Sequence, residues 1–150
     1  MFGFLALGVI GIWIFFALAW VILQVVANWL IFQKAGEAGW KSLIPIYADY
    51  ITFKISWRHR IFFWIWLLGT LSLSYSYWMT AGTGSMPEGG AAAVMSFLAL
   101  AAAVISVTLA YKKSRAFGHG IPFALGLLFF TPLFTLILGF GSSVYYGPQD

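Results

Sequence analysis

The residues best suited to metal chemistry are two histidines and two carboxylates near the basic segments of the chain. His59 and His119 could meet at one end of the protein, and Asp49 or Glu37 could then complete a zinc or nickel site. Their spacings match no metal motif, and His59 stands between two arginines, where a cation is repelled. The simpler interpretation is that both histidines are solvated. The sequence therefore predicts neither a metal ion nor a cofactor.

Two amides could instead line a polar pathway. Gln24 and Asn28 interrupt a long apolar run, and their spacing of four places them on one face of a helix. Amides inside apolar helices more often hydrogen-bond to a neighbouring helix, so a packing role is the alternative. A pore would add the hydroxyl groups of the second apolar run, which are Thr70, Ser72, Ser74 and Ser76.

The composition points to a membrane. Of the 150 residues, 62% are hydrophobic and 8% are charged, with a mean hydropathy of +0.93. A soluble domain needs far more charge to cover its surface. The chain has no cysteine, which excludes disulfides and thiolate chemistry. The N-terminal run lacks a basic start and is longer than the apolar core of a signal peptide, so we interpret it as mature protein.

The order of apolar runs predicts an all-α membrane protein. We expect residues 1–150 to form one domain of four transmembrane helices, with an interfacial amphipathic segment between the first two. Gly36 and Gly39 end the first run, and Pro45 opens the amphipathic segment. The expected spans are 8–33, 61–79, 91–111 and 122–140, and the interfacial segment is 40–58.

Two features indicate how these helices pack. Small residues recur at spacings of three and four along the third span, which would let another helix approach closely. Pro132 lies within the fourth span and should kink it. The small-residue positions are Ser96, Ala99, Ala103, Ser106 and Ala110.

All eight positive residues lie in two short loops, and the net charge is +4. In a four-span protein these loops share one side, so the positive-inside rule places both termini outside the cytoplasm. The same side chains could hold anionic lipid headgroups, a role compatible with setting topology. This clustering also argues against a nucleic-acid surface. The eight residues are Lys34, Lys41, Lys54, Arg58, Arg60, Lys112, Lys113 and Arg115.

Two blocks carry a resemblance to a known family: KAGEAGWKSLIPIYADYITFKI at 34–55 and RAFGHGIPFALGLLFFTPLFTLILGFGSSVYYGP at 115–148. They resemble an uncharacterised family of small bacterial multi-span proteins, a domain of unknown function. The resemblance implies a protein of the bacterial cytoplasmic (inner) membrane and supplies no activity. Ala48 and His119 depart from the usual Asn and Lys of the family. The matching positions are Lys34, Ala35, Gly36, Gly39, Trp40, Pro45, Tyr47, Phe117, Gly118, Gly120, Gly126, Pro132, Gly139, Phe140 and Gly141.

Some members of that family are described as signal peptidases, and Ser85-Met86-Pro87 resembles the Ser-Met-x-Pro around the signal-peptidase nucleophile. The match is one residue short. A serine–lysine dyad also needs a lysine within hydrogen-bond reach. Every lysine here is predicted on the opposite membrane face, roughly 30 Å away. A turn rich in Gly, Ser and Pro is the simpler interpretation of this segment.

These observations favour a non-enzymatic membrane protein that acts by helix packing. We expect an accessory or scaffold subunit of a membrane complex, or a homo-oligomer, that contacts lipids and a protein partner. The alternative is a small oligomeric channel or transporter, in which Gln24 and Asn28 face a pore. A membrane enzyme resembling a signal peptidase is a further alternative.

Overall fold

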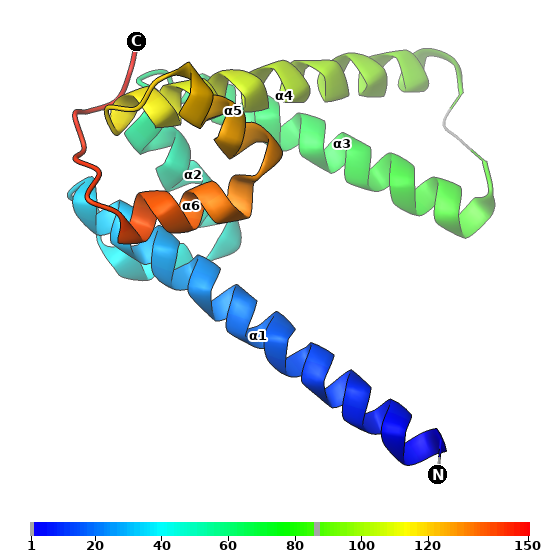
Figure 1. The fold of residues 1–150 in the computed structure, drawn as a ribbon. Helices are drawn as coiled ribbons and strands as arrows, with labels where there is room; N and C mark the ends of the chain where they lie inside the picture. Colours follow the sequence, from blue (N-terminus) through cyan, green and yellow to red (C-terminus); the bar gives the residue numbers. More distant parts are fainter. Residues whose placement is uncertain (1, 86–87) are drawn as a thin grey trace.

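The computed structural model describes the backbone of residues 2–85 and 88–150 and the side chains of residues 10–85 and 88–150. The fold of these residues is all-α (Figure 1), as the order of apolar runs predicts. The helices of the described residues are α1 (Phe2–Lys34), the 3₁₀ helix η1 (Gly39–Leu43), α2 (Pro45–Ser56), α3 (Ile61–Thr83), α4 (Gly89–Ala116), α5 (Ile121–Phe129) and α6 (Thr131–Phe140).

The first three expected spans each lie within one helix, α1, α3 or α4, and the expected segment 40–58 covers most of η1 and all of α2. Two described stretches, Ile10–Lys34 of α1 and Gly89–Ala116 of α4, are long and apolar enough to cross a membrane. The helix α4 continues five residues beyond the expected end of its span at residue 111. Lys112 and Lys113 are therefore helical, whereas the sequence pattern predicts a loop there.

The two basic loops begin with the same backbone motif. At the end of α1, the N–H of Glu37 donates to the carbonyl of Phe32 at 2.8 Å, with Gly36 at φ +76° between them. At the end of α4, the N–H of His119 donates to Ser114 O at 2.9 Å, with Gly118 at φ +74°. Both are Schellman caps, and both need a left-handed residue, which glycine adopts without strain.

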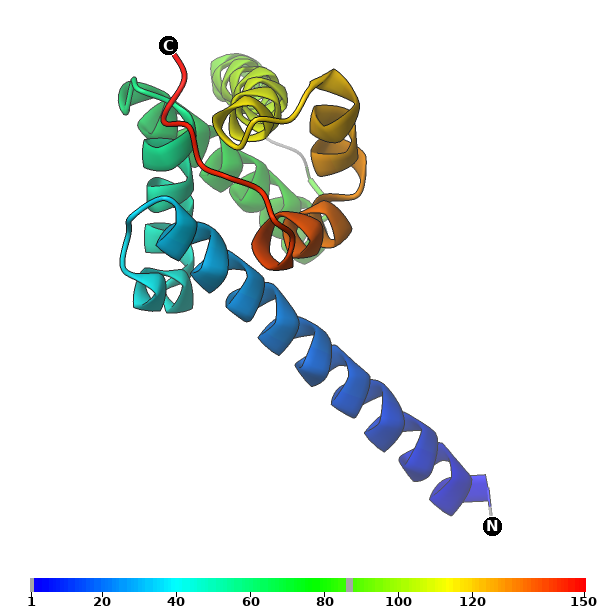
Figure 2. The ribbon, with the colours of Figure 1, turned by 60° about the vertical axis from the view of Figure 1, so that its left-hand side comes forward.

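The expected single span at 122–140 is wrong: this segment forms two helices that fold back on each other (Figures 1 and 2). Pro132 has no N–H to continue a helix, so the chain breaks at Phe130 and restarts as α6. The rings of Phe123 and Phe134, on either side of the break, are 5.0 Å apart. His119 precedes α5, Ser143 follows α6, and their side chains are 2.8 Å apart, so the hairpin returns to its starting end.

The C-terminal segment also lies at the basic end of the molecule. Its backbone pairs with the ends of two helices, through Tyr146 N to Ala116 O at 2.8 Å and Gln149 N to Ser56 O at 3.1 Å. Arg58 donates to the carboxylate of Asp150 at 3.0 Å. The sequence predicts that the C-terminus and the basic loops lie on opposite sides, whereas the structure places them next to each other, because the α5–α6 hairpin returns to the end where it starts.

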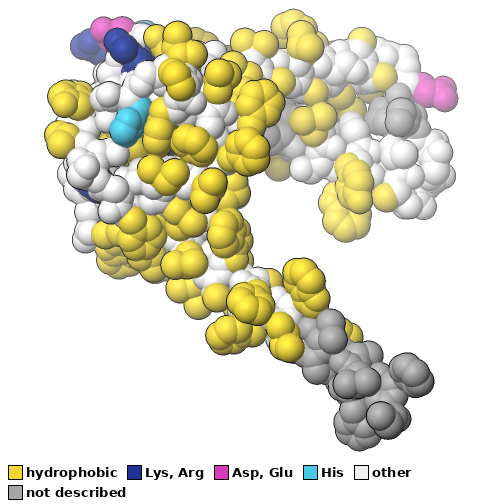
Figure 3. Space-filling view, in the orientation of Figure 1, with side chains coloured by type: hydrophobic (Ala, Val, Ile, Leu, Met, Phe, Trp, Pro, Cys, Tyr) yellow, Lys and Arg dark blue, Asp and Glu magenta, His cyan; other side chains and the backbone are white. Residues whose placement is uncertain are grey.

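The core gathers where the helix ends meet at the basic end. α1 packs on α6, α4 packs on α5, and α3 pairs with α4 as a long hairpin that projects from this core, as α1 does (Figures 1 and 3). A second cluster, around Phe53, Trp57 and Phe63, joins α2 to α3. The main cluster consists of Ile31, Phe32, Ile51, Ile55, Ala116, Phe117 and Leu138.

Candidate functional site

A polar cavity of about 460 Å³ lies between the helices. Residues from α1, α2, α3, α4, α5 and α6 line it. Figure 2 shows these helices arranged around a common centre. Apolar lining comes mainly from Leu127 and Leu128 of α5 and from Trp66. The polar lining residues are Gln24, Asn28, Asp49, Thr52, Ser106, Lys113, Thr131 and Thr135.

Lys113 is the most unusual of these residues. Its side chain lines the cavity and is only 9% exposed. The contacts within the described part of the chain give its ammonium no hydrogen bond and no ion pair. Lys113 follows Ser106 and Ala110 at spacings of seven and three, so all three share one face of α4. That periodicity could have located Lys113 in the sequence, but assigning it to a loop concealed the signal.

Asp49 supplies the opposite charge from α2. Partial removal of water around its carboxyl raises its pKa, and the positive charge of Lys113 partly offsets this shift. Ion pairs within the described residues are Glu37 with Lys41, Glu37 with Lys54, and Arg58 with Asp150. Asp49 and Lys113 thus face the same cavity without contacting each other.

Gln24 and Asn28 both line the cavity, as their shared helix face predicts. The amide nitrogen of Gln24 donates to the carbonyl of Pro132 at 3.1 Å, which ties α1 to the first turn of α6. The N-terminal end of α6 lies at the cavity through Thr131 and Pro132. Pro132 therefore does more than kink a span: it creates a helix start whose positive dipole end adjoins the polar lining.

The small-residue positions of α4 are divided between two environments. Ser106 and Ala110 line the cavity, and the indole N–H of Trp66 donates to the Ser106 hydroxyl at 3.0 Å. Ala103 is exposed. A close approach of α3 to α4 occurs at Gly69, where an added Cβ would lie 2.4 Å from the carbonyl oxygen of Leu98.

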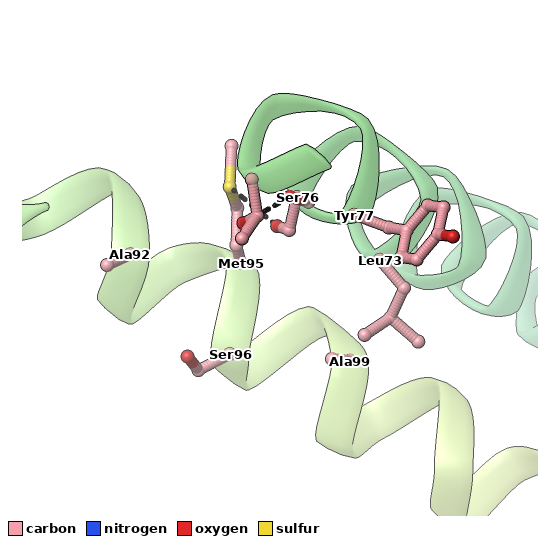
Figure 4. A pocket seen from close by; sticks show the side chains of 8 residues that line it. Leu73, Ser76, Tyr77, Ala92, Met95, Ser96 and Ala99 are labelled. Carbon is pink, nitrogen blue, oxygen red and sulfur yellow. Dashed lines mark hydrogen bonds between the residues drawn. The ribbon is translucent and has the colours of Figure 1, made fainter. Parts of the chain in front are cut away.

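Ser96 and Ala99 line a second, more apolar groove of about 450 Å³ between the outer parts of α3 and α4. Figure 4 shows Ser76 and Tyr77 of α3 facing Met95 and Ala99 of α4. The Ser76 hydroxyl donates to its own helix, at Ser72 O, and lies 3.5 Å from the sulfur of Met95. This groove contains no charged residue, so the central cavity is the better candidate for a binding site.

Several basic residues have partners inside the protein. Lys34 donates to Leu138 O at 2.7 Å and Gly141 O at 2.6 Å, which caps the C-terminal end of α6. Lys41 and Lys54 both bind the Glu37 carboxylate, and these hydrogen bonds lower the pKa of Glu37.

The remaining basic residues lie around the C-terminal segment or at the surface. Lys112 donates to the main-chain oxygen of Asp150 and lies over the Trp57 ring. Arg60 donates to the Tyr50 hydroxyl at 3.4 Å, and Arg115 is exposed. Many of the basic residues for which the sequence predicts a role in lipid-headgroup binding or topology thus make contacts within the protein.

The other candidate sites are not assembled. His59 is exposed, whereas His119 contacts Ser143 and stacks on Phe123. Within the described residues, His, Asp and Glu form no group of three or more that could hold a metal ion. Ser85 is exposed beside Thr83, at 2.8 Å between their hydroxyl oxygens. Residues 86 and 87 of that motif lie outside the described residues.

A family model matches residues 40–148, which is most of the chain: the protein belongs to a family of unknown function, DUF5684. The resemblance to an uncharacterised family is therefore confirmed. No curated protein and no solved structure matches the chain. The matched residues supply Asp49, Lys113 and the α5–α6 hairpin, whereas Gln24 and Asn28 precede them.

Proposed function

We propose that the chain is an integral membrane protein that binds a small polar solute in its central cavity, as a step in moving that solute across the membrane. The observation that carries this proposal is Lys113, which is buried in a cavity lined by many polar side chains and has no hydrogen bond or ion pair among the described residues. An ionisable residue among membrane helices is costly and is kept mainly for binding or transport. The role is non-enzymatic.

The helix lengths support three membrane crossings and one re-entrant hairpin. The 23 residues of α3 extend about 35 Å, enough for a hydrocarbon core of about 30 Å, and α1 and α4 are longer. The 9 and 10 residues of α5 and α6 extend about 15 Å or less, which is half a crossing. Broken half-helices at a polar site are a recurrent feature of transporters. In this arrangement the basic loops and the C-terminal segment face the cytoplasm of a bacterial cell, and the N-terminus lies outside.

The decisive experiment fills the cavity. Ala110 lines it, so Ala110→Phe should block solute binding and flux in reconstituted liposomes. Val107→Phe adds a ring to the same helix at an exposed position outside the cavity and should leave both unchanged. Gln24→Leu should also reduce flux, because it removes an amide from the lining. Equal flux in Ala110→Phe and the unaltered protein would rule out this function.

The membrane arrangement can be tested separately, because the chain has no native cysteine. A membrane-impermeant maleimide should label Ser142→Cys from the side that contains the basic loops and Ser85→Cys from the opposite side. Both positions are exposed. Labelling of both cysteines from the same side would contradict a re-entrant hairpin.

A second candidate function is helix packing with a partner or with a second copy. Residues 10–18 and 20–23 of α1 are exposed around the whole helix, and this part of α1 carries large apolar side chains such as Trp13 and Phe15 (Figure 3). Lipid covers such a surface adequately, but an accessory subunit would use it. Native mass spectrometry from nanodiscs tests this role: a strictly monomeric protein without a co-purifying partner would count against it.

A further inference from the structure

We propose that the solute is a zwitterion, a small molecule that carries both an ammonium and a carboxylate group, such as an α-amino acid. This inference rests on the proposed function and specifies its substrate class. It begins with the two opposite charges of the cavity, Asp49 on α2 and Lys113 on α4, which line the same space and do not contact each other.

A charge held away from water is costly unless it is paired. Lys113 is such a charge, because it is only 9% exposed. Asp49 is exposed but lines the same cavity, so the two opposite charges would be expected to form an ion pair if the cavity served packing alone. The ion pairs of the described residues do not include one between Asp49 and Lys113. A ligand with both charges supplies a partner for each, whereas a simple anion leaves Asp49 unpaired and a simple cation leaves Lys113 unpaired.

The surroundings of Lys113 suit a carboxylate. The N-terminal end of α6, at Thr131 and Pro132, opens onto the same cavity, and its helix dipole favours negative charge. This helix start is independent of Lys113, because it comes from the proline break and not from α4. Lys113 and this helix end together form the half of the site that would bind the carboxylate.

The surroundings of Asp49 suit an ammonium group. Thr52, one turn further along α2, also lines the cavity. Its hydroxyl already donates to Ala48 O at 2.9 Å, so its oxygen is left to accept a hydrogen bond. Asn28 contributes an amide oxygen as a further acceptor. The cavity volume, about 460 Å³, is within the usual range for small-molecule sites.

The test uses purified protein in nanodiscs and the twenty standard α-amino acids as probes, with binding measured by calorimetry. The tightest probe is then compared with its C-terminal amide, which lacks the carboxylate, and with its N-acetyl derivative, which lacks the ammonium. The free amino acid should bind at least tenfold more tightly than either derivative. Comparable binding of all three forms would overturn the inference.

Two variants assign each half of the site. Lys113→Met should abolish the preference for the free acid over the amide, and Asp49→Asn should abolish the preference for the free amine over the N-acetyl form. Lys112→Met is the matched control, because Lys112 contacts Asp150 and not the cavity, and it should keep both preferences. Lys113→Arg keeps the positive charge and should keep the acid preference, which covers the case in which the Met variant does not fold.

Failure of this inference can be distinguished from failure of the proposed function. If no amino acid binds but another polar solute does, and Ala110→Phe blocks it, the cavity is a solute site and the zwitterion inference is wrong. If Ala110→Phe affects no solute, the proposed function itself is wrong. If both Lys113→Met and Asp49→Asn keep the full discrimination, the assignment of the two charges is wrong.

Discussion

The basic end of the molecule and its projecting parts both contain many large apolar side chains but differ in packing. We call the first the body, defined by the main core cluster, and the second the arms, which are residues 10–23, 71–83 and 89–101. In the body, Ile31, Phe32 and Leu138 have no exposed surface. In the arms, every described side chain is at least partly exposed. Apolar side chains therefore form a core in one region and an exposed surface in the other.

The largest difference should appear when one aromatic ring is removed from each region. Phe117 in the body is 2% exposed and Phe15 in an arm is 67% exposed. Phe117→Ala should lower the free energy of unfolding by roughly 3–5 kcal/mol, because it leaves a cavity. Phe15→Ala should change it by less than about 0.5 kcal/mol. Unfolding in mixed micelles measures both, and similar losses would mean that the arm is also packed.

Glycines provide a second comparison. An added Cβ at Gly139 would lie 2.7 Å from the backbone oxygen of Ala27, so Gly139→Ala must push α6 from α1. The expected loss of stability is about 1–3 kcal/mol. An added Cβ at Gly11 meets nothing within 4 Å, and Gly11→Ala should be neutral or stabilising by up to about 1 kcal/mol. A stabilising Gly139→Ala would show that the α1–α6 contact is looser than described.

The helix cap at Lys34 should have an intermediate effect. Lys34→Met leaves the carbonyls of Leu138 and Gly141 without their charged donor, at a cost of about 1–2 kcal/mol. Arg115→Met removes a positive charge from an exposed position and serves as the control. If the two variants lost equal stability, the effect would come from net charge rather than from the cap.

The smallest effect concerns acid sensitivity of the body. The pKa of Glu37 is lowered from its ordinary value of 4.5 by hydrogen bonds from Lys41 and Lys54. Its contribution to stability is therefore complete above pH 4.5 and is lost as the pH falls through the lowered pKa. Glu37→Gln should flatten unfolding curves in that window. Glu88→Gln, at an exposed position just before the α4 arm, should leave them as they are.

The first three expected spans each fall within one helix, and the boundaries with strong local signals were the easiest to recognise. Gly36, Pro45 and Gly84 each stop or start an element through backbone conformation alone. The prediction of a single span at 122–140 was wrong because the local signal there is ambiguous. A proline inside an apolar run allows both a kinked helix and a hairpin, and the choice depends on contacts with other helices.

Contacts between helices also determined which residues form the candidate site. Gln24 and Asn28 were identified from spacing, but Lys113 was grouped with Lys112 as a loop residue. Helix α4 turns these neighbours in different directions, so that one contacts Asp150 and the other lines the cavity. For Asp49, the sequence analysis considered a role as a metal ligand and did not predict a place in this cavity.

By itself, the sequence determined an all-helical apolar chain, the glycine and proline boundaries, and the collection of positive charge at one end. These properties depend on residue type and on near neighbours along the chain. Only the tertiary structure decided that the last helix pair turns back, that the C-terminal segment joins the basic end, and that Asp49 and Lys113 share one cavity. The physical reason is that each of these outcomes depends on packing between segments distant in the chain, as when Lys34 caps α6, and no local pattern encodes such a contact.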